Sequence, residues 1–168
     1  MRRVMLSVVL MALLSWGTSP HAAEPLPMPK GPVVLTLSGN IERTNVSGQA
    51  QFDMPMLEAL GLRSIRTHYS MVDKAHLFEG VALRAVLERV GAKGKVMKAA
   101  ALNDYQVDIP LDDLQYEPII AMRADGQALK MRDKGPLWIV YPREAHRVLQ
   151  DVKYDARWIW QLNRLHIE

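Results

Sequence analysis

Four segments between predicted strands combine polar side chains with aromatic rings, a mixture typical of binding sites. Their members are Thr67, His68, Tyr69, Asn103, Asp104, Tyr105, Arg132, Asp133, Arg157, Trp158, Ile159 and Trp160. Polar groups on loops that a sheet holds in place are where binding sites are usually assembled. We therefore interpret these segments as candidate parts of a small-molecule site. The alternative, that Trp158 and Trp160 fill the core near the end of the chain, stays open at this point.

Residue types that carry most catalytic and metal chemistry are missing or scattered. The chain has no cysteine, which excludes disulfides, thiolate nucleophiles, cysteine-bound zinc and iron–sulfur clusters. The histidines beyond the N-terminal region are His68, His76, His146 and His166. Their spacing does not place two of them on one helix face toward a metal. A glycine-rich phosphate loop, a nucleophile elbow and a paired-carboxylate motif are also missing.

The N-terminal segment predicts export to the periplasm. Arg2 and Arg3 precede an apolar run over residues 4–16, the pattern of a secretory signal peptide, and we expect residues 1–23 to be removed. About a dozen apolar residues are fewer than the roughly 20 that a spanning helix needs, so no stable membrane insertion is expected. Residues 24–32 hold four prolines and are expected to form an extended, solvated leader. Residues 33–168 then form a single domain.

The charge balance argues against nucleic-acid binding. The full chain has 21 Lys and Arg against 18 Asp and Glu, a formal net charge of +3. Two of the basic residues belong to the expected signal peptide, so the mature chain is close to neutral. A basic face interleaved with aromatic residues would be expected of a nucleic-acid-binding domain.

Local patterns predict a mixed α and β (α+β) fold. Strands are predicted at residues 33–37, 63–71, 95–102, 105–109, 119–123, 128–131 and 137–141, with a final strand after a turn at 154–158. A short helix is predicted at residues 54–60, capped by Asp53. A second helix is predicted to open at Gly80 and to end at Gly91, because four apolar residues between them fall on one stripe. These four residues are Leu83, Val86, Leu87 and Val90.

The order of several short motifs resembles the molybdopterin-binding domain of sulfite-oxidase-type oxidoreductases over residues 33–167. The motifs are Phe78-Glu79-Gly80-Val81-Ala82-Leu83, Ala101-Leu102-Asn103-Asp104-Tyr105, Ile109-Pro110, Ala121, Asp125-Gly126, Gly135-Pro136-Leu137 and Pro142. The resemblance implies the sulfite-oxidase-like molybdopterin-binding fold, a compact mixture of sheet and helices with a cleft for a pterin cofactor.

Two departures from that family change the expected function. The resemblance implies a molybdenum-binding cysteine at about residues 65–69, where this chain has none, and Thr, His or Tyr cannot reproduce a soft thiolate ligand. It also implies a basic phosphate anchor soon after Gly135-Pro136, where this chain has Trp138. We therefore expect a cleft that binds a pterin as a ligand, without molybdenum and without catalytic residues.

The chain also resembles the PruR-type periplasmic pterin-binding proteins, through residues 101–105, Lys134-Gly135-Pro136-Leu137-Trp138 and the Trp158/Trp160 tail. This resemblance implies a sensor or adaptor that relays pterin occupancy to the periplasmic domain of a membrane signalling protein, with control of cyclic-di-GMP. A flat pterin needs a ring to stack on and an acceptor for its donor edge. The expected ligand-binding residues are Thr67, His68, Tyr69, Asn103, Asp104, Tyr105, Arg157, Trp158 and Trp160. Of these, Trp158, Trp160 or Tyr105 would stack, Asp104 or Asn103 would pair with the edge, and Thr67 or His68 would close the mouth. Arg157 has two interpretations, a contact to the ring carbonyl or a structural ion pair. The alternative function is a periplasmic molybdopterin-dependent oxidoreductase whose metal ligand is Asp, Ser or His.

Overall fold

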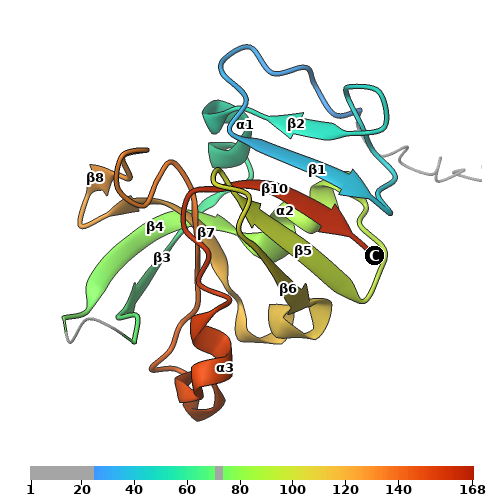
Figure 1. The fold of residues 1–168 in the computed structure, drawn as a ribbon. Coiled ribbons are helices and arrows are strands. Elements are labelled where there is room, and N and C mark those ends of the chain that lie inside the picture. The colour runs from blue at the N-terminus through green and yellow to red at the C-terminus, as the bar shows by residue number, and fades with distance from the viewer. Residues whose placement is uncertain (1–24, 71–73) are drawn as a thin grey trace, which may run out of the picture.

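Two five-stranded sheets and a few short helices build the protein, in a computed structural model that describes residues 25–70 and 74–168 (Figure 1). This mixture confirms the expected α+β class. The predicted signal peptide and the end of the strand predicted at residues 63–71 lie outside the described residues. Within the described part, no helix is long and apolar enough to cross a membrane.

The first sheet joins the beginning and the end of the domain. Its strand order is β2 (Ala50–Phe52), β1 (Leu35–Gly39), β10 (Leu162–Ile167), β5 (Val96–Ala101) and β6 (Gln106–Pro110). β1 and β10 pair in parallel, whereas the other neighbours are antiparallel. The last strand therefore lies in the middle of the sheet, and the chain segment that leads into it must cross the domain.

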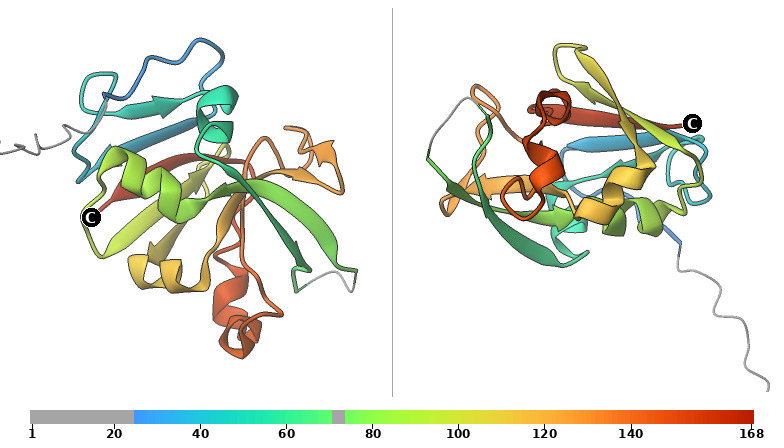
Figure 2. Two further views of the ribbon diagram at one scale, coloured as in Figure 1. Left: turned by 180° about the vertical axis from the view of Figure 1, so that it is seen from behind. Right: turned by 90° about the horizontal axis from the view of Figure 1, so that it is seen from below.

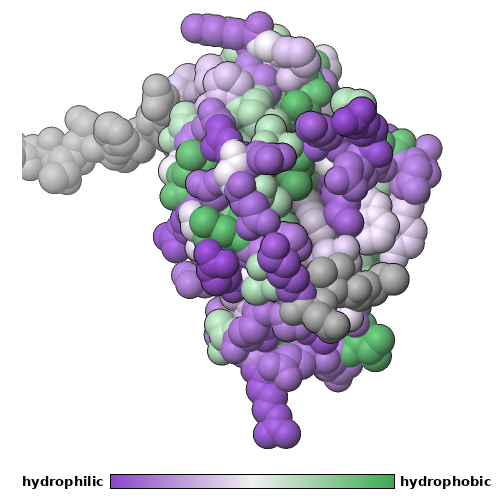
Figure 3. Space-filling view, turned by 90° about the vertical axis from the view of Figure 1, so that its left-hand side faces the viewer, coloured by the Kyte–Doolittle hydropathy of each residue, from purple (hydrophilic) through white to green (hydrophobic). Residues whose placement is uncertain are grey.

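The second sheet is antiparallel. Its path is β3 (Leu62–Thr67), β4 (His76–Ala82), β7 (Ile119–Ala124) and β8 (Gln127–Ala128), and β9 (Trp138–Val140) pairs with β7. Buried residues of both sheets join in one core cluster. On the face shown in Figure 3, hydrophobic residues occur in small areas separated by hydrophilic ones.

The helices are short. They are α1 (Met54–Glu58), α2 (Leu83–Val90), α3 (Val152–Asp155) and the 3₁₀ helices η1 (Leu111–Tyr116) and η2 (Arg147–Gln150). The predicted apolar stripe of α2 is confirmed, because all four of its members are buried. Gly91 ends α2 in the left-handed conformation with φ of 64°, as expected for a glycine at that position.

The predicted start of α2 at Gly80 is wrong, because Gly80 belongs to β4. A Cβ at Gly80 would lie 2.0 Å from the carbonyl oxygen of Ile120 on the neighbouring strand β7. The glycine is required for this close approach of two strands and is not a helix signal. The strand β2 was not predicted at all, because three residues are too short to show a period.

The described part of the leader expected at residues 24–32 has no regular secondary structure, but it is not a free spacer. Leu26 is only 6% exposed and joins the core. The backbone N–H groups of Lys30 and Gly31 donate hydrogen bonds of 2.8 and 2.9 Å to Oδ2 of Asp53. Proline prevents a helix here, but an extended chain can still pack when an apolar side chain finds the core and its amides find an acceptor.

A buried ion pair anchors the segment between α3 and β10. The Arg157 guanidinium donates from Nη1 to both carboxylate oxygens of Asp113 on η1, at 2.8 and 2.6 Å. Tyr141 Oη donates to Oδ2 of the same carboxylate at 2.9 Å. Tyr116 and Tyr154 add an edge-to-face ring contact, and Figure 2 shows α3 beside η1. Asp113 thus ties the C-terminal segment to the second sheet.

Loss of the Asp113 charge should destabilise the domain strongly. Asp113→Asn leaves Arg157, whose side chain is only 17% exposed, without a counter-charge. We expect a loss of about 3 kcal/mol in the free energy of unfolding, measured by urea denaturation. Glu117→Gln is the control, because its pair with Arg63 is exposed on both sides and should contribute less than about 1 kcal/mol. Equal effects of the two variants would contradict a central role for Asp113.

The hydrogen bonds that the Asp53 carboxylate accepts predict how the stability of the domain depends on pH. Hydrogen bonds from the backbone N–H groups of Met56 and then Gly31 hold the pKa of Asp53 below its usual value. Ionised Asp53 therefore stabilises the folded state fully above about pH 4, and this contribution is lost as the pH falls through the lowered pKa. The stability difference between the native chain and Asp53→Asn should shrink below about pH 4. A constant difference would contradict this, and Asp112→Asn, an exposed carboxylate, controls for the loss of one charge.

Candidate functional site

A pocket of about 320 Å³ lies between the turn that joins β5 to β6 and the segment that joins α3 to β10. The lining residues are Ala101, Asn103, Tyr105, Asp155, Ala156, Trp158, Ile159 and Trp160. Most of the lining is apolar and aromatic, with a few polar groups, which is the usual composition of a small-molecule site.

The turn on one side of the pocket is held by its own polar residues. Asn103 Oδ1 accepts a hydrogen bond of 3.1 Å from the backbone N–H of Tyr105. Asp104 has a φ of 63°, a left-handed conformation that Asp and Asn tolerate. The backbone bond from Ala101 N–H to the Tyr105 carbonyl closes the turn. The predicted turn between two strands is confirmed.

The segment on the other side is fixed by ion pairs and backbone bonds. Arg157 is held by Asp113, and Asp155 accepts a hydrogen bond of 2.5 Å from Nη1 of Arg143. The carbonyl of Ile159 accepts a bond of 3.0 Å from the N–H of Ile139 in β9. This wall of the pocket is therefore positioned by elements that are distant in sequence, whereas the turn opposite is held by its own residues.

Trp158 lies in an aromatic cluster behind the pocket. Its ring centroid is 6.1 Å from that of Trp138 and 6.4 Å from that of Tyr69. Phe78 and Tyr141 lie within 6.5 Å of it. Trp158 is 4% exposed, so the interpretation of this residue as part of the core is confirmed. Its Nε1–H is buried without a hydrogen-bond partner, which is costly for an indole.

Trp160 and Tyr105 are the accessible rings of the pocket. Trp160 is 44% exposed and Tyr105 is 52% exposed, so both present aromatic surface to solvent. Trp160 is therefore not a core residue, in contrast to Trp158. The Trp138 ring meets that of Trp160 edge-on at 6.4 Å. Trp138 itself is 3% exposed, so the aromatic residue that stands where the family resemblance implies a phosphate anchor is buried.

The sequence-predicted residues separate into those that line the pocket and those that do not. Four of the nine line it together, namely Asn103, Tyr105, Trp158 and Trp160. Tyr69 contacts the ring of Trp158 and accepts a hydrogen bond of 3.2 Å from Nζ of Lys134. The ligand role of these residues stays a prediction.

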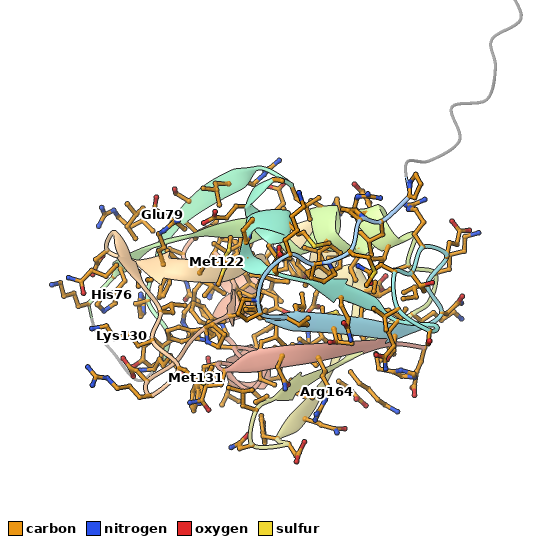
Figure 4. All side chains as sticks on the ribbon, turned by 90° about the horizontal axis from the view of Figure 1, so that it is seen from above. His76, Glu79, Met122, Lys130, Met131 and Arg164 are labelled. Atoms are coloured by element: carbon orange, nitrogen blue, oxygen red, sulfur yellow. The ribbon has the colours of Figure 1, made fainter. Side chains whose placement is uncertain are left out.

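Two predicted residues form ion pairs instead. The carboxylate of Asp104 is bound to Arg164, which Figure 4 labels beside β10, and its side chain is 78% exposed. Arg157 pairs with the buried Asp113, the structural alternative that its sequence context left open. Neither residue lines the pocket.

Thr67 and His68 form a separate cluster with Glu144. Thr67 is fully buried, and its Oγ1 accepts a bond of 3.2 Å from the N–H of Arg143. Glu144 accepts from both the backbone N–H and the ring Nδ1 of His68. Burial raises the pKa of Glu144, but hydrogen bonds from Thr67, the backbone and His68 outweigh it, so the pKa lies below its usual value. The carboxylate is therefore ionised and orients the imidazole.

Asp155 is a polar pocket residue that the sequence did not reveal, and the adjacent Ala156 is another lining residue outside the predicted segments. Asp155 lies two residues before the expected segment, and no motif marks it. The acidic member of the nine residues expected to bind the ligand is Asp104, which lies in the turn on the other side of the pocket and does not line it. The signal that could have found Asp155 is its place in the stretch just before Arg157, but only the tertiary structure brings that stretch to the turn at residues 102–105.

The lining of the pocket has the size and the chemical groups that suit an organic ring. No group of three or more His, Asp or Glu side chains within residues 25–70 and 74–168 is arranged to hold a metal ion. The pocket has room for a bicyclic heteroaromatic ring, accessible aromatic faces and polar groups at Asn103 and Asp155. These features suit a pterin ring system.

Comparison with known proteins shows the family of the chain. None of the curated proteins compared matches it. Among solved structures, the crystal structure of the sulfane dehydrogenase SoxCD from Paracoccus pantotrophus is similar, with a TM-score of 0.59 and 17% sequence identity. The alignment covers 79% of this chain and 37% of that chain, so the likeness shows the fold and extends over little more than a third of the larger protein. Residues 48–154 match the oxidoreductase molybdopterin binding domain. The chain belongs to this family, and the sulfite-oxidase-like molybdopterin-binding fold expected from its motifs is confirmed.

Proposed function

We propose that this protein is an exported, non-catalytic pterin-binding domain that acts as a sensor or adaptor for a membrane signalling partner. The observation that carries the proposal is the pocket with accessible aromatic rings in a molybdopterin-binding family member that has no cysteine. A thiolate is the soft ligand that this family is expected to use for molybdenum. Without it, the pocket retains features that recognise the organic ring.

The pterin would be held by stacking and by hydrogen bonds at its edge. Trp160 and Tyr105 expose the aromatic faces on which a flat ring can stack. Asn103 uses its Oδ1 within the turn, so its side-chain N–H groups remain for an acceptor on the ligand. Pocket volumes that hold small molecules begin at roughly 300 Å³, and this pocket is just above that size.

Exposed apolar side chains around the pocket support a relay role. Leu102 and Tyr105 are exposed in the turn, and Trp160 is exposed on the opposite wall. Leu102 N–H bonds to the carbonyl of Gln161, which joins the two walls next to the pocket. A partner that contacted these side chains would sense whether a ring occupies the space between them. We place the partner on a membrane protein because of the expected export signal and the resemblance to PruR-type proteins.

One observation favours the alternative, a molybdopterin-dependent oxidoreductase with a non-cysteine metal ligand. His68 lies in the region where the family is expected to carry its cysteine, and Glu144 orients its ring through Nδ1. Metal-binding histidines commonly have such a carboxylate partner on the other ring nitrogen. Nε2 of His68 is then the atom that would face a metal.

Ligand and metal measurements on the exported protein distinguish the two functions. Pterins should raise the melting temperature, and a ligand at 100 times its dissociation constant adds about 2.7 kcal/mol to the stability. Trp160→Ala should abolish most of this rise, whereas Val152→Ala, an exposed residue on α3 outside the pocket lining, should retain it. Metal analysis of the same sample should find no stoichiometric molybdenum. One molybdenum atom per chain, lost on His68→Ala, would overturn the sensor proposal in favour of the enzyme.

A further inference from the structure

Asp155 supplies the acidic side chain among the residues that line the pocket. It ends α3 and precedes the segment that carries Trp158 and Trp160. Its side chain is 25% exposed, so it is partly withdrawn from water. A carboxylate in this position is a strong acceptor for N–H groups of a ligand.

Arg143 orients the Asp155 carboxylate by a hydrogen bond to one of its two oxygens. Arg143 Nη1 donates to Oδ1 of Asp155 at 2.5 Å, and Nη2 of Arg143 donates to the carbonyl of Gln150 at 3.2 Å. Within the described residues, Oδ2 of Asp155 receives no hydrogen bond. The pair therefore fixes the carboxylate of a lining residue, and one of its oxygens has no hydrogen-bond partner among the described residues.

Asn103 contributes the opposite hydrogen-bonding character. Its Oδ1 already accepts a bond from the N–H of Tyr105, so the unused hydrogen-bonding groups of this side chain are mainly its two N–H donors. The lining thus combines an acceptor at Asp155 with donors at Asn103. A 2-amino-4-oxo pteridine has the matching edge, because N3–H and the 2-amino group donate and the 4-oxo group accepts.

We propose that Asp155 reads the 2-amino and N3–H edge of the ligand and makes the pocket select 2-amino-4-oxo pteridines over 2,4-dioxo pteridines. This inference rests on the proposed pterin binding. The dioxo ring keeps the same shape and stacking surface but replaces the amino donor by an oxygen. That oxygen would face the carboxylate, so repulsion replaces a charge-assisted hydrogen bond.

The test compares two ligands of the same shape at pH 7. Dissociation constants for pterin and for lumazine, its 2,4-dioxo counterpart, are measured by calorimetry on the exported protein. The native chain should bind pterin at least about tenfold more tightly than lumazine, since hydrogen bonds to charged groups contribute more than neutral ones. Asp155→Asn should lose most of this preference, and Asp112→Asn should keep it.

A second variant separates ligand recognition from the support that Asp155 gives to the fold. Arg143→Met removes the same ion pair but leaves the Asp155 carboxylate in the pocket, so it should lower the melting temperature and keep the preference for pterin. Equal affinities of the native chain for the two ligands, or an unchanged ratio in Asp155→Asn, would overturn the role of Asp155 while pterin binding stands. Failure of the native chain to bind either ligand would overturn the proposed function itself.

Discussion

The carboxylate of Asp113 is the point at which the separate parts of this domain are held together. It is 4% exposed and accepts hydrogen bonds from Tyr141 and Arg157. Burial and the Asp113 charge raise the pKa of Tyr141 far above its usual value, so the phenol stays a donor. A buried carboxylate is tolerable only when its charge is compensated and its oxygens are bonded. Because Asp113 holds Arg157 in place, it also fixes the next residue, Trp158, which lines the pocket.

The topology explains why such an anchor is needed. The last strand, β10, lies between β1 and β5, so the chain must leave the second sheet after β9 and return to the middle of the first. The crossing segment carries Asp155, Trp158 and Trp160 past the turn at residues 102–105. Two ion pairs, Arg143–Asp155 and Arg157–Asp113, fix this segment in place. The pocket lies between the segment and the turn. The residues of this segment that line the pocket are therefore held in place by contacts at both of its ends.

The family is named for binding a molybdopterin, whereas the residues of this chain suit the organic ring of such a cofactor and offer no thiolate for its metal. Residues 48–154 match a molybdopterin binding domain, yet the chain has no cysteine that could supply a thiolate ligand. The described residues supply aromatic faces, a polar turn and a carboxylate, all of which suit the ring system. Thr67, His68 and Glu144 form a compact hydrogen-bonded cluster in the region expected to hold the cysteine.

The sequence by itself determined the features that depend on near neighbours along the chain. These include the apolar stripe of α2, the turn at residues 102–105, the missing cysteine and the aromatic character of the tail. Only the tertiary structure decided that Gly80 serves a strand crossing, that Leu26 is buried, and that Trp158 is core while Trp160 is exposed. It also decided that Asp155 lines the pocket while Asp104 and Arg157 are used in ion pairs. The physical reason is that a local pattern reports which side chains are polar or apolar, whereas their partners come from strands brought together by long-range pairing.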